Sequence, residues 1–350
     1  MRAAPIVLAV DGGNSKTHLA LVGADGHVRA LARGPLSSPH HIGVDGCLGL
    51  LEQLFDEAVE QAGLVRDGAP VAAIGKLLLA GVDFPSEELE LQTLASARGW
   101  ADRVSVGNDT VALLRAGTER GWGVAVVCGA GINCIGVAPD GRQARFPALG
   151  EITGDWGGGY DVGMAAVSAA ARSEDGRGPK TSLEQCVPAH FGLQTPTELA
   201  FAFHVQRIPR RDVLELAPLV FAEADRDAVA AGIVDRLAEE VVALARAALT
   251  RLDLAKEPVE VVLGGGLLKN ARGRVLDGIA AGLAEVGPAI EVHPTSSAPV
   301  VGAALLGLDE LGADAEAQAR ARRELAEAVE RAQPAAPGIT VTTPRRPNDG

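Results

Sequence analysis

The chain has 350 residues and a mass of 35.8 kDa, a length typical of two domains of ordinary size. Hydrophobic residues make up 47% of it and charged residues 22%, values of an average soluble globular protein that exclude a wholly disordered chain. The formal net charge is −13 and the lysines are scattered singly. A broad surface for a phosphate backbone is therefore excluded, and we expect no nucleic-acid partner.

The N-terminal apolar run covers only Ile6 to Val10 before Asp11 and two glycines. It is too short for the core of a signal peptide or for a membrane span. The longest apolar stretch, residues 122–138, is interrupted by Gly129, Gly131 and Asn133. The sequence therefore predicts a cytoplasmic protein with no membrane partner.

The first part of the chain predicts three strands joined by tight turns. Residues 6–10 form a buried-strand run, residues 17–23 a second, and residues 27–33 a third after the turn at 24–26. Helical spacing of apolar residues follows at 46–62. Two further buried strands are expected at 73–82 and at 104–110.

From residue 123 the same order recurs. Strands are expected at 124–127, 134–138 and 142–146, later at 259–266, where a strand runs into a glycine turn, and at 289–295. Two copies of one strand order indicate an internal duplication. Between them, residues 212–252 predict a long helical region, and a charged helix is expected at about 313–332. Residues 334–350 are rich in proline, glycine and threonine, which predicts a disordered tail.

Three glycine-rich turns each follow a buried strand, at residues 11–13, 129–131 and 264–266. Glycine lets the backbone approach a ligand closely, so that successive N–H groups can point at phosphate oxygens. One such turn is typical of any hairpin, but three at matching positions of a duplicated unit predict phosphate binding. Residues 12–17 lack the glycine that precedes the lysine of a P-loop, and the turn leads into a strand, which excludes a Rossmann site.

These turns resemble the motifs of the actin-like ATPase and sugar kinase superfamily. Residues 11–17, 129–133 and 264–266 are similar to its first phosphate, second phosphate and adenosine motifs. The segment GEITGDWGGG at 150–159 resembles the GDEGS-type segment of the BadF/BadG/BcrA/BcrD family, which includes N-acetylglucosamine kinases. The resemblance extends from Ile6 to about Leu311.

The resemblance implies an α/β fold of two duplicated ribonuclease-H-like domains, each with a five-stranded mixed sheet, which close on ATP and a sugar in the cleft between them. The N-terminal domain is expected at residues 1–115 plus 298–333, and the C-terminal domain at 116–297.

The resemblance also implies roles in phosphoryl transfer. Asp109, in the segment Asn108-Asp109-Thr110, matches the base that takes the proton of the sugar hydroxyl; the alternative is a helix N-cap. Asp11 is expected to hold Mg²⁺ through water molecules. The residues expected to bind ATP are Gly12, Gly13, Asn14, Ser15, Lys16, Gly129, Ala130, Gly131, Gly264, Gly265 and Gly266.

For the sugar, the resemblance implies contacts from Asn133, Asp155 and Gly150, although Asp155 has the alternative of only bracing its loop. Two positions depart from the family near the expected sugar pocket. Pro39 stands where relatives often have an asparagine, and Leu149 where they often have a tryptophan. His40 is the candidate that substitutes for the missing hydrogen-bond donor.

The expected function is therefore a Mg²⁺- and ATP-dependent kinase that phosphorylates the 6-hydroxyl of N-acetylglucosamine or a related amino sugar, with a homodimer as the expected assembly. Two alternatives remain open. An ATPase activator of an iron–sulfur dehydratase or reductase needs clustered cysteines, and no CxxC motif occurs among Cys47, Cys128, Cys134 and Cys186. An ATP-binding regulator of this fold needs a helix-turn-helix, for which we expect no room before Ile6.

Overall fold

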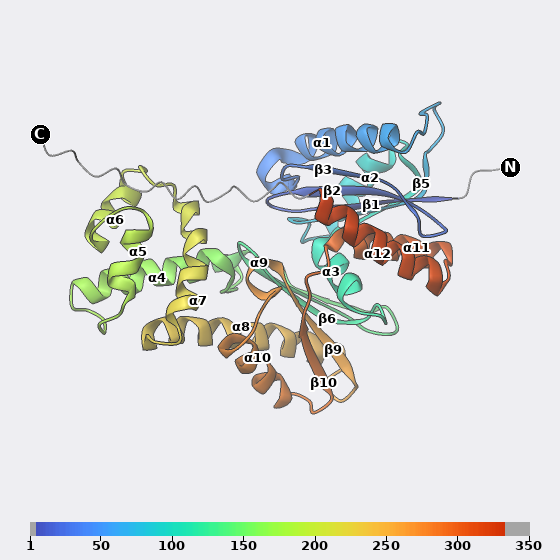
Figure 1. The fold of residues 1–350 in the computed structure, drawn as a ribbon. Coiled ribbons are helices and arrows are strands. Elements are labelled where there is room, and N and C mark those ends of the chain that lie inside the picture. Colours follow the sequence, from blue (N-terminus) through green and yellow to red (C-terminus); the bar gives the residue numbers. More distant parts are fainter. Residues whose placement is uncertain (1–4, 333–350) are drawn as a thin grey trace, which may run out of the picture.

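The computed structural model describes residues 5–332, and in this part of the chain two five-stranded sheets have the same strand order (Figure 1). The first has the order β3-β2-β1-β4-β5 and the second β8-β7-β6-β9-β10. The first sheet contains β1 (Ile6–Gly12), β2 (Thr17–Gly23), β3 (Val28–Gly34), β4 (Ala72–Leu79) and β5 (Ala101–Asn108). The second contains β6 (Gly123–Cys128), β7 (Ile132–Val137), β8 (Gln143–Arg145), β9 (Val259–Gly264) and β10 (Ile290–Pro294).

Both sheets are mixed in the same way. β1 pairs antiparallel with β2 and parallel with β4, and β6 pairs antiparallel with β7 and parallel with β9. The duplicated fold class predicted from the sequence is thereby confirmed. The domain boundaries stay a prediction, and the tail predicted at 334–350 lies outside the described residues.

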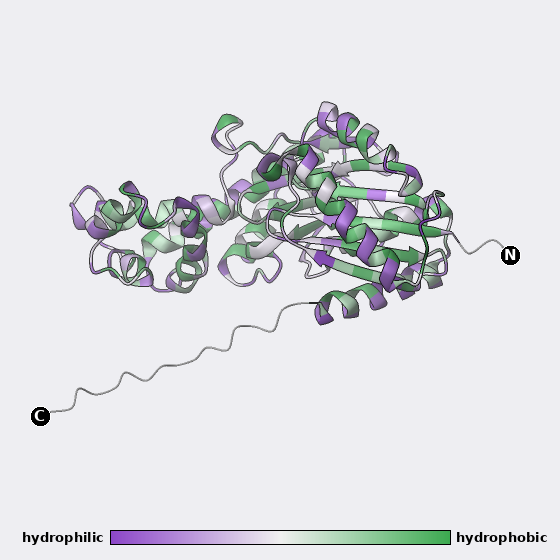
Figure 2. Cartoon of the chain, turned by 90° about the horizontal axis from the view of Figure 1, so that it is seen from above, coloured by the Kyte–Doolittle hydropathy of each residue, from purple (hydrophilic) through white to green (hydrophobic). Residues whose placement is uncertain are grey.

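Side-chain alternation along β1 explains how the first sheet is covered on both faces. Ile6, Leu8 and Val10 contribute to one buried cluster, whereas Val7 and Ala9 contribute to another. Helices α1 (Pro39–Gln61) and α2 (Pro85–Ser96) cover the first face, and α11 (Pro299–Leu311) and α12 (Ala315–Arg331) lie over the second. Figure 2 shows apolar strands between helices whose outer faces are polar.

The second sheet is covered on one face by α8 (Ala228–Arg251) and α10 (Arg274–Ala284). A helical segment inserted between β8 and α8 extends away from the sheet (Figure 1). It consists of η1 (Gly150–Ile152), α4 (Gly158–Glu174), α5 (Leu183–His190), α6 (Pro196–His204), η2 (Arg210–Leu216) and α7 (Ala217–Glu223). The short α9 (Gly265–Leu268) follows β9.

Helix α3 (Asp109–Gly117) connects β5 of the first sheet to β6 of the second. Its Leu113 and Leu114 pack with Ala125 and Val262 of the second sheet, while Ala112 packs with α11 and the first sheet. A Cβ atom on Gly302 of α11 would collide with the Ala112 carbonyl oxygen. The two helices therefore cross in close contact between the sheets, and α3 begins directly at the carboxyl end of β5.

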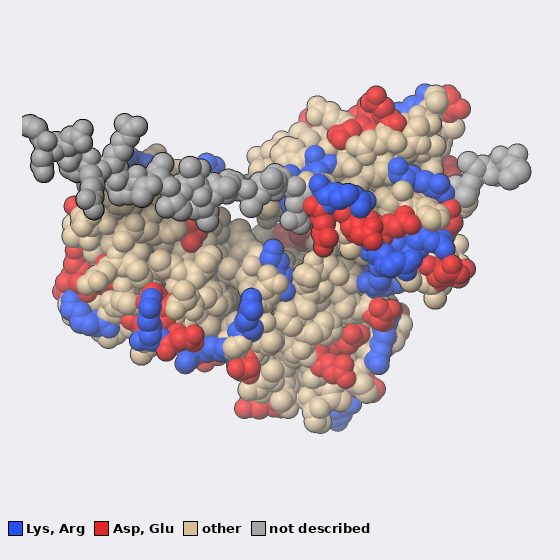
Figure 3. Space-filling view, viewed as in Figure 1, with Lys and Arg blue, Asp and Glu red and all other residues tan. Residues whose placement is uncertain are grey.

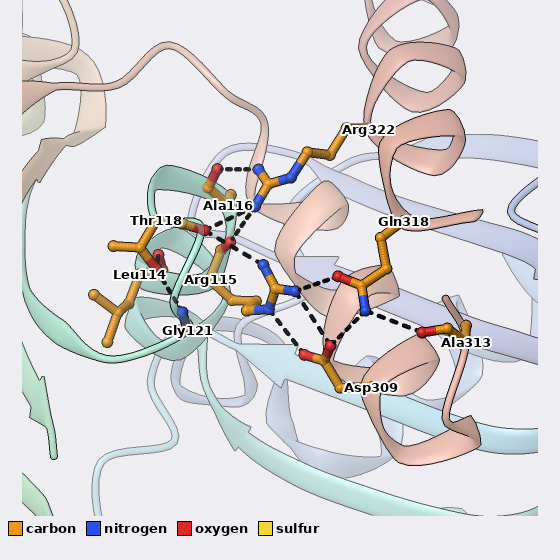
Figure 4. A network of polar contacts seen from close by, with 9 residues as sticks. All are labelled: Leu114, Arg115, Ala116, Thr118, Gly121, Asp309, Ala313, Gln318 and Arg322. Atoms are coloured by element: carbon orange, nitrogen blue, oxygen red, sulfur yellow. Dashed lines mark hydrogen bonds and ion pairs between the residues drawn. The ribbon is translucent and has the colours of Figure 1, made fainter. Parts of the chain in front are cut away.

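The far end of α3 is held by a buried polar network (Figure 4). The Arg115 guanidinium donates to both carboxylate oxygens of Asp309, over 2.8 and 3.2 Å, and to Gln318 over 2.8 Å. Arg322 of α12 donates to the carbonyl oxygens of Ala116 and Thr118, each over 2.7 Å, and to that of Arg115 over 3.2 Å. Helix α12 thus caps the C-terminal carbonyl groups of α3.

The start of one helix differs from the prediction. Helix α1 begins at Pro39 rather than near residue 46, with a break at Gly43, whose φ is 73°. His40 and His41 therefore lie in the first turn of this helix. The helical region predicted at 212–252 is confirmed and contains η2, α7 and α8. Helix α8 begins at Ala228 because the Asp227 side chain accepts hydrogen bonds from the amides of Val229 and Ala230.

Acidic and basic side chains alternate on the face shown in Figure 3, which carries no broad basic area. Over residues 5–332, the helices are all too short or too polar to cross a membrane.

Candidate active site

In each of the first two glycine turns, the leading amide is hydrogen-bonded within the turn. In the first, the Gly13 amide donates to the Lys16 carbonyl over 2.9 Å, and in the second the Gly129 amide donates to the Gly131 carbonyl over 2.9 Å. These two amides are therefore used within the turns. The amides that follow, of Asn14 and Ser15 and of Ala130 and Gly131, are exposed and have no acceptor within the described chain. Each turn thus presents two adjacent free N–H groups, an arrangement that suits a phosphate oxygen.

The third turn is shaped largely by packing. Gly265 has φ +83° and touches the backbone of Cys128, so that no side chain fits there, and Gly264 packs against Leu113. A Cβ on Gly266, in contrast, would project into open space. Of the three glycines, Gly266 is the one that leaves room for a nucleotide.

The GDEGS-type segment braces the second turn. The amide of Gly159 donates to the Gly129 carbonyl over 2.8 Å, and that of Tyr160 donates to the Ala130 carbonyl over 3.0 Å. Gly158, with φ +81°, lies against the backbone of Gly131 where a Cβ would collide. The glycine run at 157–159 is therefore explained by close packing on the turn, a role that the sequence analysis did not assign.

Asp109 lies at the start of α3 but does not cap it. The cap is Asn108, whose Oδ1 accepts from the Thr110 amide over 3.0 Å and from the Thr110 hydroxyl over 2.6 Å. The Asp109 carboxyl is thereby free for another role. Burial, together with the charges of Asp11 and Asp83, raises its pKa to about 7.

Buried polar side chains surround the first turn. Asp11 is buried at the end of β1, and its Oδ2 lies 3.8 Å from Nδ1 of the buried His18. Both ring nitrogens of His18 and the hydroxyls of Ser37 and Ser38 have no hydrogen-bond partner among residues 5–332. Unpaired buried polar groups are rare and costly, so this edge of the first sheet is built to meet a polar ligand or water.

Within the described residues, no three His, Cys, Asp or Glu side chains come together as a metal site. Asp11 is a single buried carboxylate near the free amides of the first turn. Mg²⁺ is commonly held by one or two carboxylates together with phosphate oxygens and waters. The donor set therefore fits an ion that arrives with a nucleotide rather than a resident metal.

The proposed sugar-binding residues fall into two groups. Asn133 on β7 faces the first sheet, and its Nδ2 lies 3.5 Å from Oδ1 of Asp83. His40 is exposed and its Nε2 lies 3.3 Å from Glu87. Asp155 and Gly150 lie on a separate loop, in which the Asp155 amide donates to the Gly150 carbonyl over 3.0 Å and the Asp155 carboxylate accepts from the Thr153 hydroxyl.

Asp83 was missed by the sequence analysis. It is half-buried in the turn between β4 and α2, and burial raises its pKa to about 6. Its position in Ala80-Gly81-Val82-Asp83, at the carboxyl end of a buried strand, was the available signal, because ligands bind at that edge of α/β sheets. Ala148, with φ 52°, is a further unusual residue and lies at the start of the 150–155 loop.

Comparison with known proteins identifies the family. A profile of the BadF/BadG/BcrA/BcrD ATPase family matches residues 8–307. The chain belongs to this family. Helix α12, which caps α3, lies beyond the matched region.

Two curated relatives have an assigned activity. An N-acetylmuramic acid/N-acetylglucosamine kinase of Clostridium acetobutylicum is 28% identical over 266 residues, which cover 75% of this chain and 86% of the relative. An N-acetyl-D-glucosamine kinase of Dictyostelium discoideum is 26% identical over 313 residues, 87% of this chain and 98% of the relative.

Solved structures support the fold. A protein of Chromobacterium violaceum, assigned as an N-acetylglucosamine kinase, superposes with a TM-score of 0.66 at 24% identity and covers 87% of this chain and 99% of its own. A glucokinase of Streptomyces griseus from the ROK family, solved with glucose and AMPPNP, gives a TM-score of 0.52 at 17% identity over 87% and 99%. Both share the two-sheet architecture.

Proposed function

We propose that this protein is an ATP-dependent sugar kinase that transfers a phosphoryl group to the 6-hydroxyl of N-acetylglucosamine or a related amino sugar. The observation that carries the proposal is Asp109, a half-buried carboxyl with a raised pKa that is not used as a helix cap. The activities of the Clostridium and Dictyostelium relatives support the substrate class.

In this proposal Asp109 is the general base. A carboxylate whose pKa is about 7 is a far better proton acceptor than an ordinary aspartate, and half of it is ionised at neutral pH. It takes the proton of the sugar hydroxyl as that oxygen forms its bond to the γ-phosphorus, while the bond from the γ-phosphorus to the β-phosphate oxygen breaks and ADP leaves.

The two exposed pairs of amides, Asn14 with Ser15 and Ala130 with Gly131, would hold phosphate oxygens from the two domains. Gly12, Gly13 and Gly129 shape these turns, Lys16 lies beside the first, and residues 264–266 would lie against the adenosine. Asp11 would hold Mg²⁺, which neutralises phosphate charge when it is bound.

Asn133 would hydrogen-bond a sugar hydroxyl from the second domain. Asp155 and Gly150 would approach the sugar from their loop, and His40 from the first turn of α1. A homodimer remains the expected assembly.

The cysteines give no support to the iron–sulfur alternative. Cys47, Cys128 and Cys134 are buried in α1, β6 and β7, and Cys186 lies in α5. Burial raises the pKa of the Cys47 thiol to about 11 and that of Cys128 to about 12, so both stay neutral thiols at physiological pH.

The test is the release of ADP from Mg²⁺-ATP with N-acetylglucosamine, glucosamine, N-acetylmuramic acid, N-acetylmannosamine or glucose, with the product identified by mass and the phosphorylated position by NMR. We expect one amino sugar to stimulate turnover and D109N to abolish it. D102N is the matched control, because Asp102 is exposed on the same strand, β5. If no sugar stimulated turnover and anaerobically purified protein contained iron, the proposed kinase function would be wrong. The ATPase activator of an iron–sulfur enzyme would then be the better interpretation.

A further inference from the structure

Asp83 lies where the two domains meet at the expected sugar side of the cleft. It follows β4, and its backbone amide donates to Glu87 over 2.8 Å, which ties it to the start of α2. The turn before it contains Gly81, with φ +75°, which packs against Ser38 and His40. Asp83 is therefore fixed in place by the first domain before anything from the second domain reaches it.

Two asparagine amides point at one oxygen of this carboxylate. The Oδ1 of Asn108 is occupied by Thr110, so its Nδ2 is turned toward Asp83 and donates to Oδ1 over 2.8 Å. The Oδ1 of Asn133 accepts from the Cys134 amide over 2.7 Å, so its Nδ2 is also turned toward Asp83, at 3.5 Å. The other hydrogen bonds of each amide thus decide which end faces the carboxylate.

The two asparagines belong to different parts of the fold. Asn108 caps α3, the helix that carries Asp109 at its first position, whereas Asn133 comes from β7 of the second sheet. A second contact reinforces the junction, because Arg145 of β8 pairs with Glu88 over 2.7 Å and donates to the Val82 carbonyl over 3.3 Å. The contacts that Asn133 and Arg145 of the second domain make here are therefore all with residues 82–88 of the first domain.

The charged groups around Asp83 come from both domains, as expected for a contact that forms when the two domains close. Burial raises the pKa of Asp83, the nearby His40 and Arg145 lower it, and Glu87 raises it. Arg145 and the Asn133 amide arrive with the second domain, so an open cleft removes two groups that stabilise the carboxylate. The 3.5 Å separation from Asn133 is at the long end of the hydrogen-bond range, and we expect it to shorten when a sugar is bound.

We propose that Asp83 is a positioning residue that holds the Asn108 cap and the Asn133 amide together, so that closing the two domains sets the acceptor hydroxyl against Asp109. The proposal rests on the kinase function stated above. Asp83 acts through the two asparagines and not by touching the reacting atoms.

The test compares D83A with D83N in the full-length protein. D83A removes the shared acceptor, and we expect kcat for the sugar to fall about tenfold or more, KM for the sugar to rise, and KM for ATP to change by less than about twofold. D83N keeps an oxygen in nearly the same place and should recover much of kcat. D102A, on exposed Asp102, is the control and should match the wild type.

A double-mutant cycle with N133A separates positioning from a merely structural role. If Asp83 acts through Asn133, the loss of kcat/KM in the double variant should be clearly smaller than the product of the two single losses. Full multiplicativity, an unchanged kcat in D83A, or equal losses in both KM values that follow a lowered Tm would each overturn the proposal. All of these measurements require that a sugar stimulates ADP release by the wild-type protein. If no sugar does so, the kinase function has failed, and this result is distinct from a failure of the role proposed for Asp83.

Discussion

Asn108 and Asp109 are adjacent in the chain but make different contacts, and this difference leaves one carboxyl available in the candidate site. Asn108 takes the N-cap position, where Asn and Asp are equally suitable, and so leaves the carboxyl of Asp109 without a capping role. Asp109 is half-buried close to two further carboxylates, Asp11 and Asp83, which favours its neutral form. Asn108 thus supplies the helix cap, and Asp109 supplies a carboxyl whose raised pKa suits the proposed role of proton acceptor.

This tuning predicts the pH dependence of the reaction. Asp109 must be ionised to accept a proton, and its pKa is raised to about 7 by burial and then by its two acidic neighbours. We expect kcat/KM for the sugar to fall about tenfold per pH unit below pH 6.5 and to level off above about pH 8. Rates measured between pH 5.5 and 9 test this, and a profile that is flat down to pH 5.5 would contradict a base with a raised pKa.

The same raised pKa predicts a cost in stability. In the unfolded chain an aspartate loses its proton near pH 4, whereas folded Asp109 keeps it until about pH 7. Stability from this group is therefore full at low pH, declines as the pH rises from about 4 to 7, and is constant above. D109N does not titrate, so its Tm should exceed that of the wild type by about 2–4 °C at pH 8 and by much less at pH 5. Equal values of Tm at both pH values would contradict this.

At the scale of elements, the two duplicated glycine turns differ in length but leave the same kind of free amides. In both, the first amide closes the turn and the next two remain free, although the two sequences differ. The second copy needs an external support from the start of α4, where Gly158 and Gly159 pack on it. The first copy is supported by β4, since the Ala80 amide donates to the Gly12 carbonyl over 2.7 Å.

Helix α12 stabilises α3 through Arg322, so removing this side chain should lower the free energy of unfolding. The Arg322→Ala substitution leaves the carbonyl groups of Arg115 and Ala116 without their charged donor, and leaves that of Thr118 with only the 3.3 Å bond from Arg115. The network of Figure 4 thereby loses one of its two guanidinium groups. We expect the free energy of unfolding to fall by about 2 kcal/mol, as measured by urea denaturation. The Arg323→Ala control, exposed on the same helix, should change it by less than about 0.5 kcal/mol. Similar losses in both variants would contradict a role in capping.

At the scale of the molecule, the two sheets are joined where α3 crosses α11. In the duplicated fold these are corresponding helices, since each follows the last strand of its sheet. Their close contact at Gly302 fixes α3 between the sheets, and with it Asp109, on which the charge of Asp83 acts. Asp83 in turn lies 3.5 Å from Asn133 of β7. Packing of this crossing therefore determines both stability and the geometry of the cleft.

Substitution at the crossing tests this. A methyl group at Gly302 would collide with the Ala112 carbonyl and push the helices apart, so Gly302→Ala should cost about 1–3 kcal/mol and reduce kcat at temperatures where the protein is still folded. Gly49→Ala is the matched control: it lies within α1 with open space around it and should gain about 0.5–1 kcal/mol. Thermal unfolding and sugar-stimulated ADP release measure both effects. If Gly302→Ala were as stable and active as Gly49→Ala, the crossing would not constrain the cleft.

The sequence by itself determined the duplicated strand order, the three glycine turns and the position of Asp109 at a strand end, because strand periodicity and turn residues are local signals. The charged C-terminal helix was also predicted, since its pattern spans several turns. The start of α1 was missed because its first turn, from Pro39, is separated from the rest of the helix by the non-helical Gly43.

Only the tertiary structure decided which polar groups meet. The Asp83 carboxylate, the Asn133 amide and the free amides of the two turns come from segments far apart in the chain, and no local pattern specifies their separation or burial. The roles of Gly158, Gly265 and Gly302 were hidden for the same reason, because each is required by the close approach of another segment. Raised pKa values likewise arise from burial and neighbouring charge, which exist only after the sheets have packed.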